Sequence, residues 1–129
     1  MIMKDVGLLC ITNKRSSYYF NAMLENDLLP ALVILLKNED KVLTPGQLES
    51  DLENSFLEKL KKEVGTLKVI PTTDVNSPEL ISELKQTRET IFIYSGPGGA
   101  ILKNPILTTG KKFIHVHPGD LPAFRGCLL

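Results

Sequence analysis

The chain has 129 residues, enough for one domain with a buried core. Its 15 basic and 15 acidic residues balance, so no overall field favours a nucleic acid or an anionic membrane surface. No apolar run approaches the roughly 20 residues that cross a bilayer, and the first residues resemble a strand more than a signal peptide. The two cysteines lack metal or redox spacing, so we expect reduced thiols in a cytoplasmic protein.

The first part of the chain alternates apolar runs with amphipathic segments. Residues 6–12 form a continuous apolar run, which is typical of a parallel strand buried on both faces. Ser16 or Ser17 then offers a helix N-cap, and the helix is predicted to run to about Asn26. Residues 31–36 form a second apolar run and predict a second buried strand.

The same alternation continues through the middle of the chain. Thr44 begins a capping box for a second helix, which is predicted to stop at Gly65. A weaker strand is predicted at residues 67–70. Ser77 is a typical N-cap for a third helix, and residues 91–94 predict a fourth strand.

A glycine-rich loop follows the fourth predicted strand at residues 95–99, and residues 100–102 are expected to form a short helical turn. A fifth strand is predicted from Phe113 onward. Strands that alternate with helices imply right-handed crossovers and a parallel sheet. The sequence therefore predicts one α/β unit over residues 1–129, a Rossmann-like parallel sheet with helices on both faces.

Both histidines of the chain lie at the end of the fifth predicted strand. His115 and His117 share one face of the strand because side chains alternate, whereas Ile114 and Val116 are expected to face the core. The strand breaks at Pro118, and the carboxyl ends of parallel strands are where open α/β sheets bind ligands. We therefore expect a functional site at this point.

This stretch resembles the signature of the folate-dependent formyltransferases, in which a strand ends in Asn-x-His and a Leu-Pro loop with Arg-Gly follows. The matching residues are His117, Pro118, Gly119, Leu121, Pro122, Phe124, Arg125 and Gly126. His115 departs from the pattern because it stands where the family has asparagine. The resemblance implies a Rossmann-like domain that transfers a formyl group from 10-formyltetrahydrofolate to an amine. The acceptor would be a small molecule or a nucleotide-linked amino sugar. Methionyl-tRNA is not excluded, although the chain lacks the basic charge that tRNA binding favours.

The resemblance also implies roles for the two histidines. His117 matches the catalytic histidine, and an imidazole is suited to take the proton of the attacking amine near neutral pH. His115 stands in place of the family's oxyanion donor, and its ring N–H can also donate. The family's third catalytic residue is an aspartate a few tens of residues further on. We therefore expect residues 1–129 to be the N-terminal part of a longer or truncated protein, inactive by itself.

Two loops are candidate binding elements. By resemblance, the loop after the fourth strand lines the pterin pocket of the folate with its backbone, and the matching residues are Ser95, Gly96, Ala100, Ile101 and Leu102. Small residues let the backbone approach a flat ring, although the run 97–99 departs from the family pattern. The alternative is an ordinary tight turn, since the loop lacks the ending of a phosphate-binding P-loop.

The loop after the first strand has a basic and hydroxyl-bearing sequence: Lys14, Arg15, Ser16 and Ser17. A helix N-terminus with added positive charge favours an anion. By resemblance this loop faces the acceptor substrate, where several family members hold a phosphate. The alternative is a solvated loop with an ordinary helix cap.

Two other functions compete with formyl transfer. His115, His117 and Asp120 could belong to a metal-dependent hydrolase, although such zinc sites usually keep three protein ligands and the chain has no further histidine. The chain could instead be a non-catalytic ligand-binding module with a decayed site. Neither the acceptor nor the oligomeric state is defined by the sequence.

Overall fold

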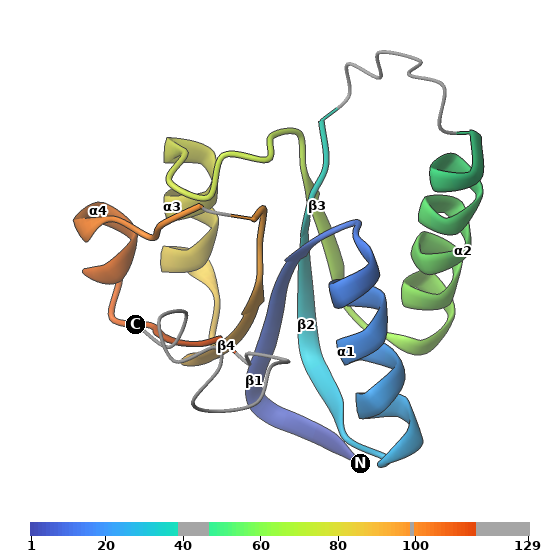
Figure 1. Cartoon of the computed structure of the whole chain (residues 1–129). Helices are drawn as coiled ribbons and strands as arrows, with labels where there is room; N and C mark the ends of the chain where they lie inside the picture. Colours follow the sequence, from blue (N-terminus) through green and yellow to red (C-terminus); the bar gives the residue numbers. More distant parts are fainter. Residues whose placement is uncertain (39–46, 99, 116–129) are drawn as a thin grey trace, which may run out of the picture.

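The sheet has five parallel strands in the order β3-β2-β1-β4-β5. The computed structural model describes residues 1–38, 47–98 and 100–115. The strands are β1 (Ile2–Ile11), β2 (Leu29–Leu36), β3 (Leu67–Ile70), β4 (Ile91–Ser95) and β5 (Lys112–Ile114). Every pair of neighbouring strands is parallel, as right-handed crossovers require. The predicted Rossmann-like α/β fold is confirmed (Figure 1).

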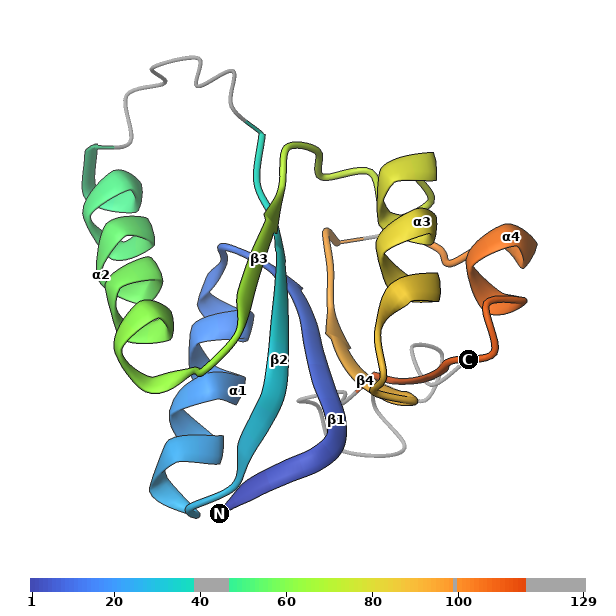
Figure 2. The ribbon, with the colours of Figure 1, turned by 180° about the vertical axis from the view of Figure 1, so that it is seen from behind.

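Helices cover both faces of the sheet, also as predicted (Figures 1 and 2). One face carries α1 (Lys14–Glu25) and α2 (Gln47–Glu63), and the other carries α3 (Pro78–Gln86) and the short α4 (Asn104–Leu107). The apolar side chains between each pair of helices and the sheet form a separate buried cluster. The cluster under α1 and α2 includes Leu8, Cys10, Phe20, Val33, Phe56 and Leu60, and the cluster under α3 and α4 includes Leu9, Ile34, Leu80, Leu84, Phe92 and Ile106.

The central strand β1 is buried on both faces because its apolar run is continuous. Leu8, Leu9 and Cys10 are fully buried, and successive residues point into opposite clusters. Gly7 lies against the ring of Phe92, where a Cβ atom would come within 2.4 Å of Phe92 Cε1. Burial raises the pKa of the Cys10 thiol to about 12, so the group stays protonated near neutral pH.

This burial predicts how Cys10 reacts. In a Cys127→Ser background, native chain is expected to resist alkylation by iodoacetamide at about pH 8, because only the thiolate is nucleophilic. The same thiol should react readily once the chain is unfolded in urea. Mass spectrometry of the two samples measures the difference. Comparable rates for native and unfolded chain would contradict the buried position of Cys10.

Two helix caps show how local sequence sets these elements. The cap of α1 is Asn13, whose side-chain Oδ1 accepts a hydrogen bond of 2.7 Å from the backbone N–H of Ser16. The predicted caps Ser16 and Ser17 were therefore wrong, because the asparagine reaches the first-turn amides from an earlier position. Ser77 caps α3 as predicted, accepting from Leu80 N at 3.2 Å. The predicted cap Thr44 lies outside the described residues.

The segment after β4 differs from its prediction. Residues 100–102 form no helical turn, and the helix begins later, at Asn104. The side chain of Asn76 explains the difference. Its Nδ2 donates to Ile101 O at 2.8 Å, and its Oδ1 accepts from Lys103 N at 2.7 Å. A side chain from the β3–α3 loop thus occupies backbone groups on both sides of Leu102, and the helix begins after them.

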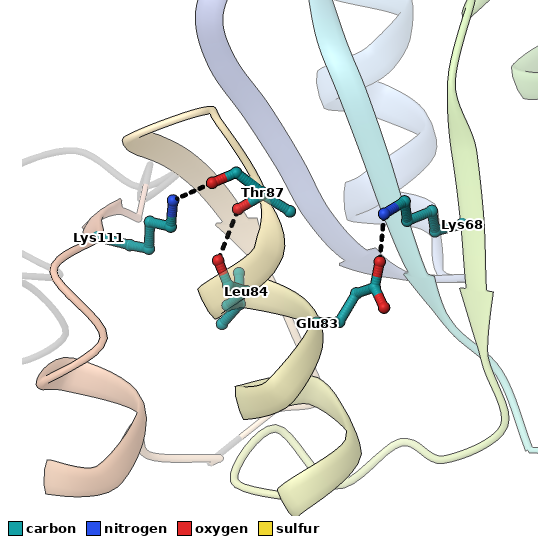
Figure 3. Close-up of polar contacts among 5 residues, drawn as sticks. All are labelled: Lys68, Glu83, Leu84, Thr87 and Lys111. Atoms are coloured by element: carbon teal, nitrogen blue, oxygen red, sulfur yellow. Dashed lines mark hydrogen bonds and ion pairs between the residues drawn. The ribbon is translucent and has the colours of Figure 1, made fainter.

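The start of β5 is tied to the loop between α3 and β4. Lys111 Nζ donates to the backbone oxygens of Thr87 and Glu89 at 2.8 and 2.7 Å. Thr87 Oγ1 donates to Leu84 O at 2.7 Å, and Figure 3 shows both hydrogen bonds of Thr87. An ion pair between Lys68 and Glu83 similarly joins β3 to α3. The ion pair thus joins the outer strand β3 to α3. The Lys111 hydrogen bonds join the residue just before β5, the other outer strand, to the loop after α3.

The register of β5 decides which of its faces meets the core. Phe113 pairs with Phe92 and packs on the α3–α4 cluster, whereas Ile114 is 48% exposed. The expectation that Ile114 faces the core was therefore wrong, because α1 and α2 cover the inner strands and leave this edge of the sheet open. Val116 lies outside the described residues.

Candidate functional site

The strand order reverses between β1 and β4. From β1 the chain runs through β2 to β3 on one side, and β4 and β5 follow on the other. Loops that leave adjacent strands in opposite directions open a crevice at this switch point, which is the usual ligand site of open α/β sheets. The loop after β1 and the loop after β4 are therefore candidates for one site.

Hydrogen bonds join these two loops directly. Arg15 Nη2 donates to Gly96 O at 2.6 Å, and the Oγ atoms of Ser16 and Ser95 share a hydrogen bond of 2.8 Å. The structure thus brings part of the predicted acceptor loop against part of the predicted cofactor loop, about 80 residues apart in sequence. Ser16 and Ser95 are fully buried, so their hydroxyls hold the loops together and do not face the solvent.

The other two residues of the predicted acceptor loop point elsewhere. Lys14 and Ser17 line a cleft of about 700 Å³ between α1 and α2. The other residues lining this cleft are Thr12, Asn13, Tyr18, Asn21, Leu52, Glu53, Ser55, Phe56 and Lys59. Within it, Glu53 accepts from Thr12 Oγ1 at 2.9 Å and lies 3.8 Å from Lys37 Nζ. The four-residue group is therefore divided between a buried contact and an open cleft.

A second cleft, of about 560 Å³, lies between the β3–α3 loop and the segment after β4. Ala100 and Ile101, both predicted cofactor residues, line it, and Ile101 is 74% exposed. The other lining residues are Thr72, Thr73, Asp74, Val75, Asn76, Pro97 and Lys103. Leu102 instead packs against the core. The volume lies within the range of small-molecule pockets, roughly 300–1,000 Å³.

His115 directly follows the carboxyl end of β5, and its side chain is exposed. Its ring meets the ring of Tyr94 edge to face, with centroids 6.0 Å apart and an interplanar angle of 60°. Tyr94 was not among the predicted site residues. The alternation of Phe92 and Tyr94 along β4, matched by Phe113 and His115, was the signal that could have identified it. His117 lies outside the described residues.

Tyr94 lies beside Gly96, the residue of the β4 loop that accepts a hydrogen bond from Arg15. Its side chain is 7% exposed, and its hydroxyl has no hydrogen-bond partner in the described part of the chain. Burial raises the pKa of the Tyr94 hydroxyl, and the nearby charge of Arg15 opposes that rise. The hydroxyl lies so close to Gly96 that a Cβ atom there would be 2.0 Å from Tyr94 Oη. The loop after β4 can therefore take this conformation only because position 96 is a glycine.

Metal centres and membrane spans are two further kinds of feature that the described residues could contain. Residues 1–38, 47–98 and 100–115 contain no group of three or more His, Cys, Asp or Glu side chains that could hold a metal ion. His117 and Asp120, on which the metal-hydrolase hypothesis depends, lie outside these ranges. None of the helices in the described ranges is both long and apolar enough to span a membrane.

Comparison with protein-family models gives no match, and comparison with curated proteins gives none either. The strand order and the helices on both faces define the class of the protein. It is a Rossmann-like α/β protein.

Proposed function

We propose that this chain forms the donor-binding part of a folate-dependent formyltransferase. The reaction moves the formyl group of 10-formyltetrahydrofolate to an amine, carried by a small molecule or a nucleotide-linked amino sugar. One observation carries the proposal. The loop after β4 and His115 after β5, which the resemblance assigns to cofactor binding and to chemistry, leave adjacent strands at one edge of the sheet, and the rings of Tyr94 and His115 are in contact.

The chemistry requires two groups that histidines can supply. The amine nitrogen attacks the formyl carbon, which places negative charge on the formyl oxygen, and the bond from that carbon to N10 of the folate then breaks. In the proposal His117 takes the proton of the amine and returns it to N10 as tetrahydrofolate leaves. His115 donates a ring N–H to the negatively charged oxygen, a role that an asparagine amide can also fill.

The cleft beside the β4 loop is the proposed site for the pterin ring. Pro97, Ala100 and Ile101 offer apolar contact, while Asn76 and the backbone around it supply polar groups at the rim. A flat heterocycle needs this combination of apolar walls and a few polar groups. Ser95 and Gly96 take part indirectly in the proposal, by fixing the course of the loop.

The acceptor is proposed to approach from the side of α1. Lys14 and Ser17 line the cleft between α1 and α2, next to the N-terminal end of α1, where an anionic group of the acceptor would be favoured. The balanced charge of the chain favours a small acceptor over tRNA. A cytoplasmic location is also part of the proposal, because Cys10 is a free thiol.

Binding of a reduced folate tests the proposal on residues 1–129. Titration calorimetry with 5-formyltetrahydrofolate, an analogue that does not donate its formyl group readily, is expected to show one site. Ile101→Glu should weaken binding at least about tenfold, since it places a carboxylate in the proposed pterin cleft. Leu107→Glu is the matched control, because Leu107 is an exposed apolar residue that does not line the cleft, and it should bind normally.

Two outcomes would contradict the proposal. If the folded chain does not bind the folate, the proposed donor-binding site is wrong. Equal binding by wild type and Ile101→Glu would place the folate elsewhere. We expect formyl transfer to need a third catalytic residue as well, an aspartate that the resemblance places a few tens of residues after His117.

A further inference from the structure

The helices α1 and α2 lie side by side on one face of the sheet, with the open cleft of about 700 Å³ between them (Figures 1 and 2). Each helix lines this cleft with side chains at helical spacing. Those of α1 are Lys14, Ser17, Tyr18 and Asn21, and those of α2 are Leu52, Glu53, Ser55, Phe56 and Lys59. Residues three, four and seven positions apart share one helix face. The cleft is therefore bounded by one stripe from each helix.

These two stripes are mostly polar, unlike a surface on which helices pack. Phe20 and Leu60, which join the helices to the core, do not line the cleft. One hydrogen bond crosses it, from Lys59 Nζ to Asn21 Oδ1 at 2.6 Å. Lys14 and Asn21 lie seven residues apart, about 10 Å along the helix axis. The cleft is therefore long enough for an extended organic ligand and not only for a small ion.

Tyr18 gives the cleft an aromatic wall. Its side chain is 79% exposed, so its ring is not used in the core. Leu52, on the stripe of α2, is 58% exposed, and Phe56 is buried. A planar ring that enters the cleft would thus meet apolar surface from both helices. The face of an exposed tyrosine is suited to stack on such a ring.

The charges around the cleft favour an anionic ligand. Lys14 and Lys59 both line it, and the hydrogen bond of Lys59 to Asn21 is to a neutral amide. Glu53 is the one acidic residue among the described residues that line the cleft, and its carboxylate lies 3.8 Å from Lys37 Nζ. Positive charge is therefore in excess. A ligand with a flat ring and attached phosphates matches both the aromatic wall and this charge.

We propose that the cleft between α1 and α2 binds a nucleotide, with its base stacked on Tyr18 and its phosphates near Lys14. Ser17 and Asn21 offer hydroxyl and amide groups to the sugar and the base edge. The site goes beyond the proposed formyl transfer, because it shares no lining residue with the proposed pterin cleft. One use of the site rests on that proposed function: the nucleotide would then be part of the formyl acceptor.

Titration calorimetry of residues 1–129 with ADP, GDP, CDP and UDP tests the site. At least one diphosphate is expected to bind with a Kd below about 1 mM. Its nucleoside and inorganic pyrophosphate should each bind at least about tenfold more weakly. Tyr18→Ala is expected to weaken binding of the diphosphate about tenfold, because the stack on the base is lost, whereas Tyr18→Phe should retain it. Tyr18 is exposed, so neither change removes a core contact.

Two lysine variants test where the phosphates lie. Lys14→Ala is expected to weaken binding of the diphosphate about fivefold. Lys62→Ala is the matched control, because Lys62 is an exposed lysine of α2 that does not line the cleft, and it should bind nearly as wild type does. Equal losses in the two variants would contradict the position of the phosphates.

Three results would overturn the inference itself. They are the absence of diphosphate binding by folded wild type, equal binding by wild type and Tyr18→Ala, and binding of pyrophosphate as tight as that of the nucleotide.

The folate titration separates this inference from the proposed function. Nucleotide binding without folate binding would keep the α1–α2 site and remove the proposed formyl transfer. Folate binding without nucleotide binding would do the reverse. Tyr18→Ala should bind 5-formyltetrahydrofolate as tightly as wild type, because Tyr18 does not line the proposed pterin cleft.

Discussion

Replacing His117 by alanine in full-length protein is expected to lower kcat for formyl transfer by about 10²–10⁴-fold. The expectation follows from the chemistry, since an amine that attacks the formyl carbon must lose a proton and alanine offers no base. The measurement is the rate of tetrahydrofolate release from 10-formyltetrahydrofolate with amino-sugar and nucleotide-linked amino-sugar acceptors. Little change is expected in binding of the formyl donor, because the proposed pterin cleft lies on other segments.

His115 provides the matched comparison for that experiment. His115→Asn places the residue of the formyltransferase signature at this position and is expected to keep kcat within a few fold. His115→Ala removes the donor to the oxyanion and should cost about 10²–10³ in kcat. Turnover of His117→Ala at the wild-type rate would remove the formyltransferase assignment. Stoichiometric zinc or iron in the purified protein would favour the metal-hydrolase alternative.

Replacing Gly96 by alanine is expected to destabilise the chain by about 1–3 kcal/mol, the usual range for overpacking. The new Cβ would lie 2.0 Å from Oη and 2.3 Å from Cζ of Tyr94, well inside contact distance. Tyr94 is buried, so its ring cannot yield without leaving its place beside His115. Urea denaturation followed by circular dichroism measures the change in the free energy of unfolding.

Gly98 offers a control two residues further along the same loop. A Cβ atom at Gly98 would meet no atom of the described residues within 4 Å, so Gly98→Ala is expected to change the free energy of unfolding by less than about 0.5 kcal/mol. The two variants differ only in the space around the added methyl group. An equal midpoint for both would show that Tyr94 is not held against Gly96.

The fold was predictable because its signals are local. The continuous apolar run of β1, the Ser-Pro start of α3 at Ser77 and the alternation of strands with helices each follow from residues close together in the chain. Right-handed crossovers then leave few arrangements of five parallel strands. Where two local signals competed, position in the chain decided, as when Asn13 capped α1 ahead of Ser16.

The site was only partly predictable because its contacts join distant segments. The sequence by itself predicted a ligand site at the carboxyl ends of the strands, with the two loops and His115 near it. Only the tertiary structure decided that Ser16 and Ser95 are buried against each other, that Asn76 bonds the backbone of Ile101 and Lys103, and that Tyr94 meets His115. Periodicity along a chain determines which face a side chain takes within its own element. The partner on that face depends on strand order and register, which are settled when the whole sheet packs.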